Sequence, residues 1–387
     1  MVIKNDATDS APFPSPNSLA KLNRYLSKRI DGFGSILSAE KFSDGQSNPT
    51  YLLTTDCSKY VLRRKPEGPV LPSAHAVDRE FRVMSALAST PVPVPVMHIL
   101  CEDKSIIGSV FFIMEYVQGT LHWDAQLTGV GDPKSRGLVY RQMNKVLADL
   151  HGVDISAVGL EGFGRPGGYC QRQYNRWSKQ YRASETESIE AMELLMQWLP
   201  NHMPEDDGRV SLIHGDYRLD NIIFAENEPK IIAVLDWELS TLGHPFSDLA
   251  YQCMQLRMPA DLALGNLSGL GGIDREAIGV PSEEEYVALY CKRRGLQEIP
   301  HWPFYLAFNF FRFAAILQGI MKRYQDGSAS NDEALSYGKM ARPTAELAVA
   351  YLRSENLLPE KSPLESVNQS KSSREKPTKS KSETVSG

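Results

Sequence analysis

Two carboxylates and one amide near the middle of the chain, Asp216, Asn221 and Asp236, have side chains that can handle protons and metal ions. The residues around them form two apolar runs that flank the polar loop 225–230, which is the pattern of a β-hairpin. In a symmetric hairpin whose midpoint falls between Glu228 and Pro229, inside that loop, Asn221 and Asp236 lie opposite each other at the open end. Asp216 lies five residues upstream, in the loop that leads into the hairpin. The spacing therefore predicts that all three side chains meet at one point.

This combination predicts the transfer of a phosphoryl group to a hydroxyl. Mg²⁺ prefers oxygen ligands, and the Asn221 amide and the Asp236 carboxylate supply them. An attacking hydroxyl needs an acceptor that orients it and takes its proton, which is the predicted role of Asp216. A His-Gly-Asp triplet or an Asp–Asn pair alone is more often only turn chemistry. The full pattern is far more specific for phosphoryl transfer, because two apolar strands join the segment from Asp216 to Asn221 to a second carboxylate, Asp236.

The elements that must position these side chains follow a pattern that changes once along the chain. Residues 18–117 predict a small antiparallel sheet, with a first helix at 18–30 and one major helix at 74–89. Its strands are expected at 36–42, 50–54, 59–64, 96–102 and 110–116. Residues 118–358 are mostly helical around the hairpin, with helices expected near 135–151, 171–199, 246–257, 283–294, 302–324 and 332–356. We therefore predict an α+β fold of two lobes, with a nucleotide in the cleft between them.

The two ends of the chain differ from this body. Residues 1–17 are proline-rich and residues 359–387 are rich in Ser, Lys and Glu, so both are expected to be disordered. Residues 361–387 carry a net charge of +3, and since the whole 387-residue chain carries −5, the first 360 residues carry −8. An acidic body argues against a nucleic-acid-binding protein, which usually presents a basic face.

The overall composition, with 42% hydrophobic and 23% charged residues, is typical of a globular protein. Five widely spaced cysteines without a Cys-x-x-Cys pair predict reduced thiols and no zinc site. The most apolar stretch, 304–321, carries Asn309 and Arg312 in its middle, so no membrane helix is expected. The N-terminal residues match neither a secretory nor a mitochondrial leader, and a cytoplasmic location is expected.

The hairpin region resembles the aminoglycoside phosphotransferase and choline kinase superfamily, which has a protein-kinase-like fold. It is most similar to the branch found as the kinase domain of acyl-CoA dehydrogenase fusion proteins. The resemblance spans roughly residues 18–357 and rests on 212–224 and 231–238 together with 45–51, 60–66, 114–117, 147–151, 162–168 and 243–250.

The resemblance implies a role for each of the three central residues. Asp216 would be the catalytic base, and Asn221 and Asp236 would hold Mg²⁺. Trp237 follows Asp236 directly, so the Phe-Gly switch of protein kinases is absent. This departure favours a small-molecule substrate over a protein substrate.

The resemblance also implies an ATP site in the first lobe. The turn 44–51 would cover the phosphates, and Glu115 and Val117 would lie in the hinge that binds adenine through backbone groups. Arg63 stands where kinases usually have a phosphate-pairing Lys, with Glu80 as its ion-pair partner. Arg keeps the charge but has a different geometry, and Lys65 is an alternative cation. The turn contains a single glycine, so its donors are Gly45, Ser47 and Asn48.

Four further features have structural and functional interpretations. His214 is expected to hold the catalytic loop, and Asp248 to accept backbone hydrogen bonds from it. Arg312 needs a partner if it is buried, which could be a carboxylate or an anionic substrate. The glycine-rich loop 162–168, followed by Arg172 and Arg176, is either an ordinary loop or a site for a phosphorylated handle such as coenzyme A.

Three functions remain open on the sequence alone. The first is an ATP- and Mg²⁺-dependent kinase for the hydroxyl of a small molecule, for which the family branch points to hydroxyacyl-CoA thioesters. The second is the same reaction on an aminoglycoside, a choline-like amine or a sugar. The third is a non-catalytic nucleotide-binding module, although the intact set of Asp216, Asn221 and Asp236 argues against it. A separate dehydrogenase partner is left open, and neither nucleic acid nor membrane is expected to bind.

Overall fold

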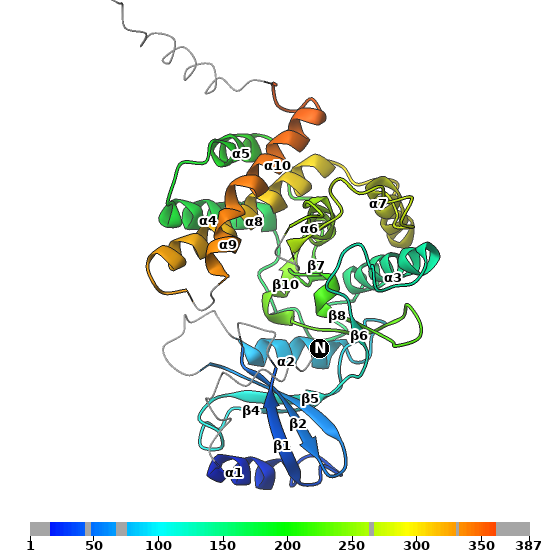
Figure 1. The fold of residues 1–387 in the computed structure, drawn as a ribbon, viewed down its shortest axis with the longest axis vertical. Helices are drawn as coiled ribbons and strands as arrows, with labels where there is room; N and C mark the ends of the chain where they lie inside the picture. The colour runs from blue at the N-terminus through cyan, green and yellow to red at the C-terminus, as the bar shows by residue number, and fades with distance from the viewer. Residues whose placement is uncertain (1–15, 43–47, 67–75, 263–266, 330–332, 361–387) are drawn as a thin grey trace, which may run out of the picture.

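A computed structural model describes residues 16–42, 48–66, 76–262, 267–329 and 333–360. These residues form two lobes (Figure 1), as the sequence predicted. Most of the two predicted disordered ends lies outside the described residues. Gly45 and Ser47 of the predicted phosphate turn also lie outside the described residues.

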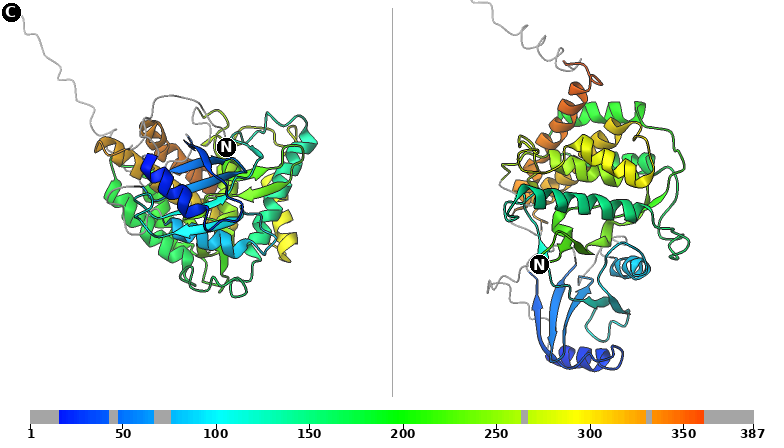
Figure 2. Two further views of the ribbon diagram at one scale, coloured as in Figure 1. Left: turned by 90° about the horizontal axis from the view of Figure 1, so that it is seen from below. Right: turned by 90° about the vertical axis from the view of Figure 1, so that its right-hand side faces the viewer.

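The N-terminal lobe is built on one antiparallel sheet of strand order β1-β2-β3-β5-β4. Its helices are α1 (Pro16–Leu26) and α2 (Val77–Leu87), and its strands are β1 (Ile36–Lys41), β2 (Thr50–Thr55), β3 (Lys59–Arg64), β4 (Met97–Cys101) and β5 (Phe111–Glu115). Helix α1 lies at the end of this lobe that is farthest from the helical lobe (Figures 1 and 2).

Alternating side chains of the central strands serve two different cores. Leu53 and Leu62 pack with Leu26 of α1 in a small cluster on the outer face of the sheet. Their neighbours Leu52 and Val61 belong instead to the large core that continues into the helical lobe. The sheet is therefore buried on both faces, which fixes the position of Arg63 at the end of β3.

The C-terminal lobe is helical and centres on one long helix, α8 (Trp302–Gln325). This helix packs against α5 (Glu190–Asn201) and, more extensively, against four others: α4 (Tyr169–Ser184), α6 (Pro245–Arg257), α9 (Ala334–Lys339) and α10 (Ala341–Ser354). The remaining helices are α3 (Pro133–His151) and α7 (Glu283–Arg294). Helix α8 has the length and composition to cross a membrane, but 83% of its most apolar window is buried, which is the position of a core helix.

Two helices that were predicted as single are each divided in the structure. The expected helix 171–199 breaks after Ser184, where Gln318 of α8 donates to the Ser184 carbonyl and the Thr186 hydroxyl and holds the chain in a turn. The expected helix 332–356 divides at Met340 into α9 and α10. Pro343 lies in the first turn of α10, where proline is tolerated, whereas a continuous helix would need the amide hydrogen that proline lacks.

The predicted hairpin is present, with a register that differs slightly from the symmetric one. It consists of β8 (Ile222–Phe224) and β9 (Ile231–Val234), which continue a sheet from β6 (Thr120–Leu121). Ile222 pairs with Val234, and the Leu235 amide donates to the Asn221 carbonyl at 2.8 Å. Asn221 therefore faces Leu235, and Asp236 lies one residue further along. The loop is centred one residue earlier than in the symmetric hairpin, since the Ala225 amide donates to the Lys230 carbonyl. An extra residue in β9, Ile232, partly offsets this difference.

Candidate active site

The predicted catalytic loop, residues 214–221, follows β7 (Ser211–Ile213), which pairs with β10 (Thr241–Gly243). Helix α6 holds this loop. The Asp248 carboxylate accepts the backbone amides of His214 at 2.7 Å and Gly215 at 2.9 Å. Burial would raise the pKa of Asp248, but hydrogen bonds from His151 and the loop outweigh it and lower that pKa. The prediction that Asp248 accepts backbone bonds from this loop is confirmed.

Two further residues fix the shape of the loop. Gly215 has φ +84°, and a Cβ there would lie 2.8 Å from the Leu239 carbonyl oxygen, so glycine is required. His214 Nδ1 accepts the Asp216 amide at 3.2 Å, and Nε2 lies 2.9 Å from the Leu235 carbonyl oxygen. This pair of contacts requires the proton on Nε2. His214 thus connects the loop before Asp216 to the strand end before Asp236, which agrees with its predicted structural role.

The Asp216 carboxylate is fixed from two sides while remaining 24% exposed. Tyr251 of α6 donates to Oδ1 at 2.6 Å, and Asn221 donates through Nδ2 to Oδ2 at 3.2 Å and to the Asp216 carbonyl at 2.9 Å. Burial and the nearby carboxylate raise the pKa of Tyr251, so its hydroxyl stays protonated and acts as the donor. Since Asn221 uses its nitrogen in these bonds, its oxygen Oδ1 is the atom that could serve a metal.

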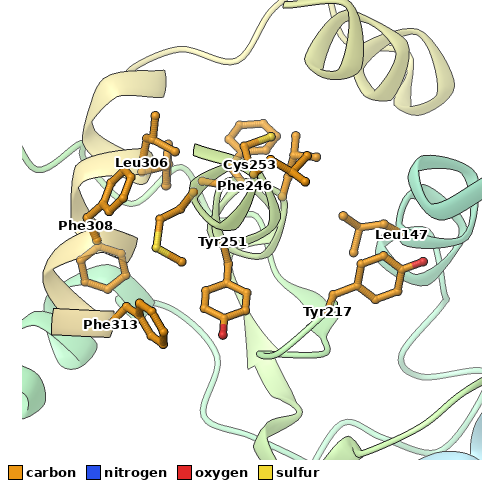
Figure 3. Close-up of a cluster of buried hydrophobic side chains, with 14 of the residues drawn as sticks. Leu147, Tyr217, Phe246, Tyr251, Cys253, Leu306, Phe308 and Phe313 are labelled. Atoms are coloured by element: carbon orange, nitrogen blue, oxygen red, sulfur yellow. The ribbon is translucent and has the colours of Figure 1, made fainter. Parts of the chain in front are cut away.

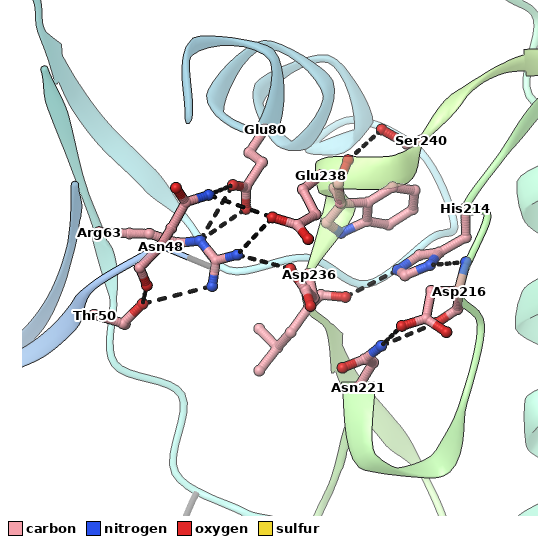
Figure 4. A network of polar contacts seen from close by, with 12 residues as sticks. Asn48, Thr50, Arg63, Glu80, His214, Asp216, Asn221, Asp236, Glu238 and Ser240 are labelled. Atoms are coloured by element: carbon pink, nitrogen blue, oxygen red, sulfur yellow. Dashed lines mark hydrogen bonds and ion pairs between the residues drawn. The ribbon is translucent and has the colours of Figure 1, made fainter. Parts of the chain in front are cut away.

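Asp236 points toward the other lobe instead (Figure 4). Its backbone is in the left-handed region at φ 62°, an uncommon conformation for a residue other than glycine. Its Oδ1 accepts Arg63 Nη2 at 2.7 Å. The structure therefore joins Asp216 to Asn221 and joins Asp236 to Arg63, so the three predicted residues divide between two neighbouring clusters.

Arg63 is the centre of the second cluster, and its predicted pairing with Glu80 of α2 is present. Arg63 Nε lies 3.0 Å from Glu80, and Nη2 lies 3.8 Å from Glu238. Asn48 donates to Glu80 at 3.0 Å and to Glu238 at 3.4 Å. Lys65, the alternative cation, pairs with Asp78 at 3.1 Å instead.

The charges in this cluster do not balance, because three carboxylates surround one guanidinium. Burial would lower the pKa of Arg63, but Glu80, Asp236 and Glu238 together raise it above its ordinary value. Glu80 is 1% exposed, and burial raises its pKa to about 8 although Arg63 opposes the shift. The excess of negative charge favours an added cation beside Asp236.

The donor set fits a magnesium ion that is held partly by its substrate. Among the described residues, no three His, Cys, Asp or Glu side chains form a complete metal cluster. Mg²⁺ is usually bound by one or two carboxylates together with substrate phosphates and water, rather than by an all-protein cage. Asn221 Oδ1 and the Asp236 carboxylate are of the right type for such a site.

The predicted hinge residues lie at the end of β5. The Glu115 amide donates to the Val96 carbonyl at 2.8 Å, and its carboxylate accepts the Val96 amide at 3.2 Å. Among the described residues, the backbone groups of Val117 make no hydrogen bond, so they are open to a ligand. Their role in binding adenine stays a prediction.

The glycine-rich loop 162–168 has protein partners in place of an anion. The Gly168 amide donates to Asp206 at 2.6 Å, and Arg172 donates to the Arg165 carbonyl at 2.7 Å. Two carboxylates, Glu205 and Asp206, line the adjoining cavity together with Arg209. These contacts favour the interpretation of an ordinary loop over a site for a phosphorylated handle.

Tyr251 and Glu238 touch the predicted set, although sequence reasoning did not single them out. Tyr251 lies three positions after Asp248, so both reach the catalytic loop from one face of α6, and this spacing was a usable signal. Glu238 lies in the short 3-10 helix η2 (Trp237–Leu239), two positions after Asp236. Its closeness to Asp236 in the sequence was the only signal that it belongs to the site.

Comparisons with known proteins agree with this geometry. A family model described as the phosphotransferase enzyme family matches residues 38–279. The mouse (Mus musculus) protein named acyl-CoA dehydrogenase family member 10 is 50% identical over 308 residues, which cover 80% of this chain and 28% of that protein. The chain spans less than half the length of the curated relatives that it matches.

Solved structures confirm the fold. A protein of Ralstonia eutropha JMP134, provisionally assigned as an aminoglycoside phosphotransferase, has a TM-score of 0.78 and 50% identity, covering 87% of this chain and 98% of that chain. A mutant of aminoglycoside phosphotransferase APH(4)-Ia, in ternary complex with ADP and hygromycin B, has a TM-score of 0.56 at 14% identity, covering 85% and 98%. The predicted α+β, protein-kinase-like bilobal fold is therefore correct.

Proposed function

The chain belongs to the phosphotransferase enzyme family, and we propose on this premise that it transfers the terminal phosphoryl group of ATP to a hydroxyl of a small molecule. The observation that supports this most strongly is the fixed carboxylate of Asp216, which Tyr251 and Asn221 hold from two sides while it stays open to solvent. A non-catalytic nucleotide-binding module would have no use for a carboxylate held in this way.

In the proposed reaction, Asp216 orients the acceptor hydroxyl and takes its proton. The hydroxyl oxygen forms the new bond to phosphorus, the bond from phosphorus to the leaving oxygen breaks, and ADP departs. Asn221 Oδ1 and the Asp236 carboxylate would hold Mg²⁺, which when bound would neutralise phosphate charge. Tyr251 keeps Asp216 in a single orientation throughout.

Arg63 is proposed to exchange partners when the nucleotide binds. It now bridges Glu80 and Asp236. A cation on Asp236 would compete with this contact and release one edge of the guanidinium, which can then donate to phosphate oxygens. Glu80 would keep Arg63 in place. Glu115 and Val117 of the hinge, with Gly45, Ser47 and Asn48 of the turn, are the proposed contacts for adenine and phosphates.

For the acceptor, we favour a hydroxyacyl thioester of coenzyme A. A cavity of about 40 Å³ lies behind the catalytic loop and is mostly apolar, with Ala125, Leu256, Met258, Leu267 and Phe313 among its lining residues. The charged residues at its wall, Arg218 and Asp220, form an ion pair with each other. The apolar lining of this cavity, and not its small volume, is the feature that favours an alkyl group. The mouse relative named as an acyl-CoA dehydrogenase suggests the same chemistry.

An amine or sugar acceptor remains the alternative, because the solved relative APH(4)-Ia is an aminoglycoside phosphotransferase. A cationic acceptor would be favoured by unpaired carboxylates near Asp216. The nearest one, Asp220, is instead neutralised by Arg218. A cytoplasmic location and a dehydrogenase partner are further parts of this proposal.

The test is to incubate the protein with ATP, Mg²⁺ and a panel of hydroxyacyl-CoAs, amino alcohols and sugars, and to follow ADP release. We expect release that depends on the hydroxyacyl-CoAs. Release with the amino alcohols or sugars alone would assign the alternative acceptor. No acceptor-dependent release across the panel would contradict the proposed function.

A further inference from the structure

The guanidinium of Arg312, in the middle of α8, lies directly behind the catalytic loop with incomplete hydrogen bonding. Arg312 is 8% exposed. Its Nη2 donates to the Gly215 carbonyl at 3.1 Å, and Gly215 is the residue before Asp216. Nε is buried without a hydrogen-bond partner. Within the described ranges, Arg312 forms no ion pair with a carboxylate.

This situation differs from that of the other buried arginines at the site. Arg63 contacts three carboxylates, and Arg218 pairs with Asp220. A buried cation without a counterion is unfavourable unless a ligand completes its contacts. The rings of Trp177 and Tyr251 lie 5.9 and 5.5 Å from Arg312 Cζ and stabilise the charge. They leave the N–H group of Nε without a hydrogen-bond acceptor.

The position of Arg312 relates it to the acceptor and not to ATP. Tyr251 contacts both Arg312 through its ring and Asp216 through its hydroxyl. Figure 3 shows this hydroxyl pointing out of the apolar cluster to which Phe308 and Phe313 belong. The guanidinium therefore lies on the C-lobe side of Asp216, whereas the Arg63 cluster lies on the side of the N-terminal lobe (Figure 4).

We propose that Arg312 binds an oxygen of the acceptor's acyl group, either a carboxylate or a thioester carbonyl, and thereby selects acyl acceptors over cationic ones. This inference rests on the proposed function, because that function defines where the acceptor binds. A guanidinium donates strongly to carboxylate and carbonyl oxygens and repels an ammonium group. The proposal assigns a specificity role to a residue that the proposed transfer chemistry does not use.

The test is calorimetric binding of hexanoyl-CoA to the full-length protein in the presence of ADP and Mg²⁺. This probe has no acceptor hydroxyl, so its binding can be measured whether or not the protein transfers phosphate. We expect Arg312→Met to weaken binding by about tenfold or more, the usual effect of losing a hydrogen bond to a charged group. Arg323→Met, at the exposed end of the same helix, should bind like the wild type. Equal affinities of the Arg312→Met and wild-type proteins would overturn the proposal.

A second arm identifies the oxygen that Arg312 contacts. Hexanoyl-pantetheine carries the thioester but no phosphate, so the weakening caused by Arg312→Met should persist with it. If the weakening appears only with the coenzyme A form, the contact is to a phosphate and the proposed acyl contact is wrong.

A third arm uses the wild-type protein alone and so does not depend on the folding of a variant. Hexanoate, hexanol and hexylamine share one alkyl chain and differ in the head group. The proposal predicts that hexanoate binds more tightly than hexanol and that hexylamine binds most weakly. Hexylamine binding as tightly as hexanoate would contradict it.

Discussion

The hydroxyl of Tyr251 donates a 2.6 Å hydrogen bond to Oδ1 of Asp216, so helix α6 sets the direction of the proposed catalytic base. The same helix holds the backbone of the loop through Asp248. One element therefore fixes both the loop and the carboxylate that the loop presents.

Tyr251→Phe removes this donor and keeps the ring. We expect kcat to fall by about tenfold, the order of effect of one hydrogen bond to a charged group, with little change in the KM for ATP. Steady-state kinetics would measure both parameters, with Tyr324→Phe on the exposed end of α8 as the control. An unchanged kcat would mean that Tyr251 serves only packing.

Arg63→Lys tests the exchange of partners proposed for the ATP site. Lysine keeps the charge but lacks the planar fork that contacts Glu80 and Asp236 together. The KM for ATP should rise by about tenfold, while the KM for the acceptor stays the same. If Lys65→Met raised the KM for ATP and Arg63→Lys did not, Lys65 would be the phosphate-binding cation.

The pKa of Glu80, raised by burial to about 8, predicts how stability depends on pH in the nucleotide-free protein. A carboxyl whose pKa is higher in the folded state contributes stability below its unfolded pKa, and this contribution is lost as pH rises through 8. Thermal unfolding should therefore occur at lower temperature as the pH rises from about 5 to 9. Glu80→Gln should flatten this slope, and the difference between the two curves is the quantity to measure. Parallel curves would show that other groups cause the slope.

The apolar cavity behind the catalytic loop predicts a limit on the acyl chain. Ala125→Leu adds bulk to its lining and should lower kcat/KM for longer hydroxyacyl-CoAs by about tenfold, with short-chain substrates unaffected. Ala157→Leu, at an exposed position, is the matched control. A uniform loss across chain lengths would indicate that the cavity does not receive the chain.

Local patterns were sufficient for much of the fold and for part of the site. The proximity of Asn221 to Asp216 depends on a short loop, so their spacing predicted it. The pairing of Arg63 with Glu80 was predicted from the family resemblance. The register that places Asp236 beyond Asn221 depends on where the loop is centred and on an extra residue in β9, and the residue pattern predicted neither.

The remaining site contacts come from packing between distant segments. Tyr251 reaches Asp216 across 35 residues, and Arg312 reaches Gly215 across 97. The sequence showed that a buried Arg312 would need a partner, but only the packing of α8 behind the catalytic loop shows where that partner must come from.

The most direct test of the central claim is the activity of Asp216→Asn, measured as acceptor-dependent ADP release, with nucleotide binding followed by calorimetry. The substitution keeps the size of the side chain and removes the proton acceptor. We predict a fall in kcat of about a hundredfold or more, as for loss of a general base, with unchanged affinity for Mg²⁺ and ADP. Equal activity in the variant and the wild type would contradict the assignment of Asp216 as the base and the mechanism built on it.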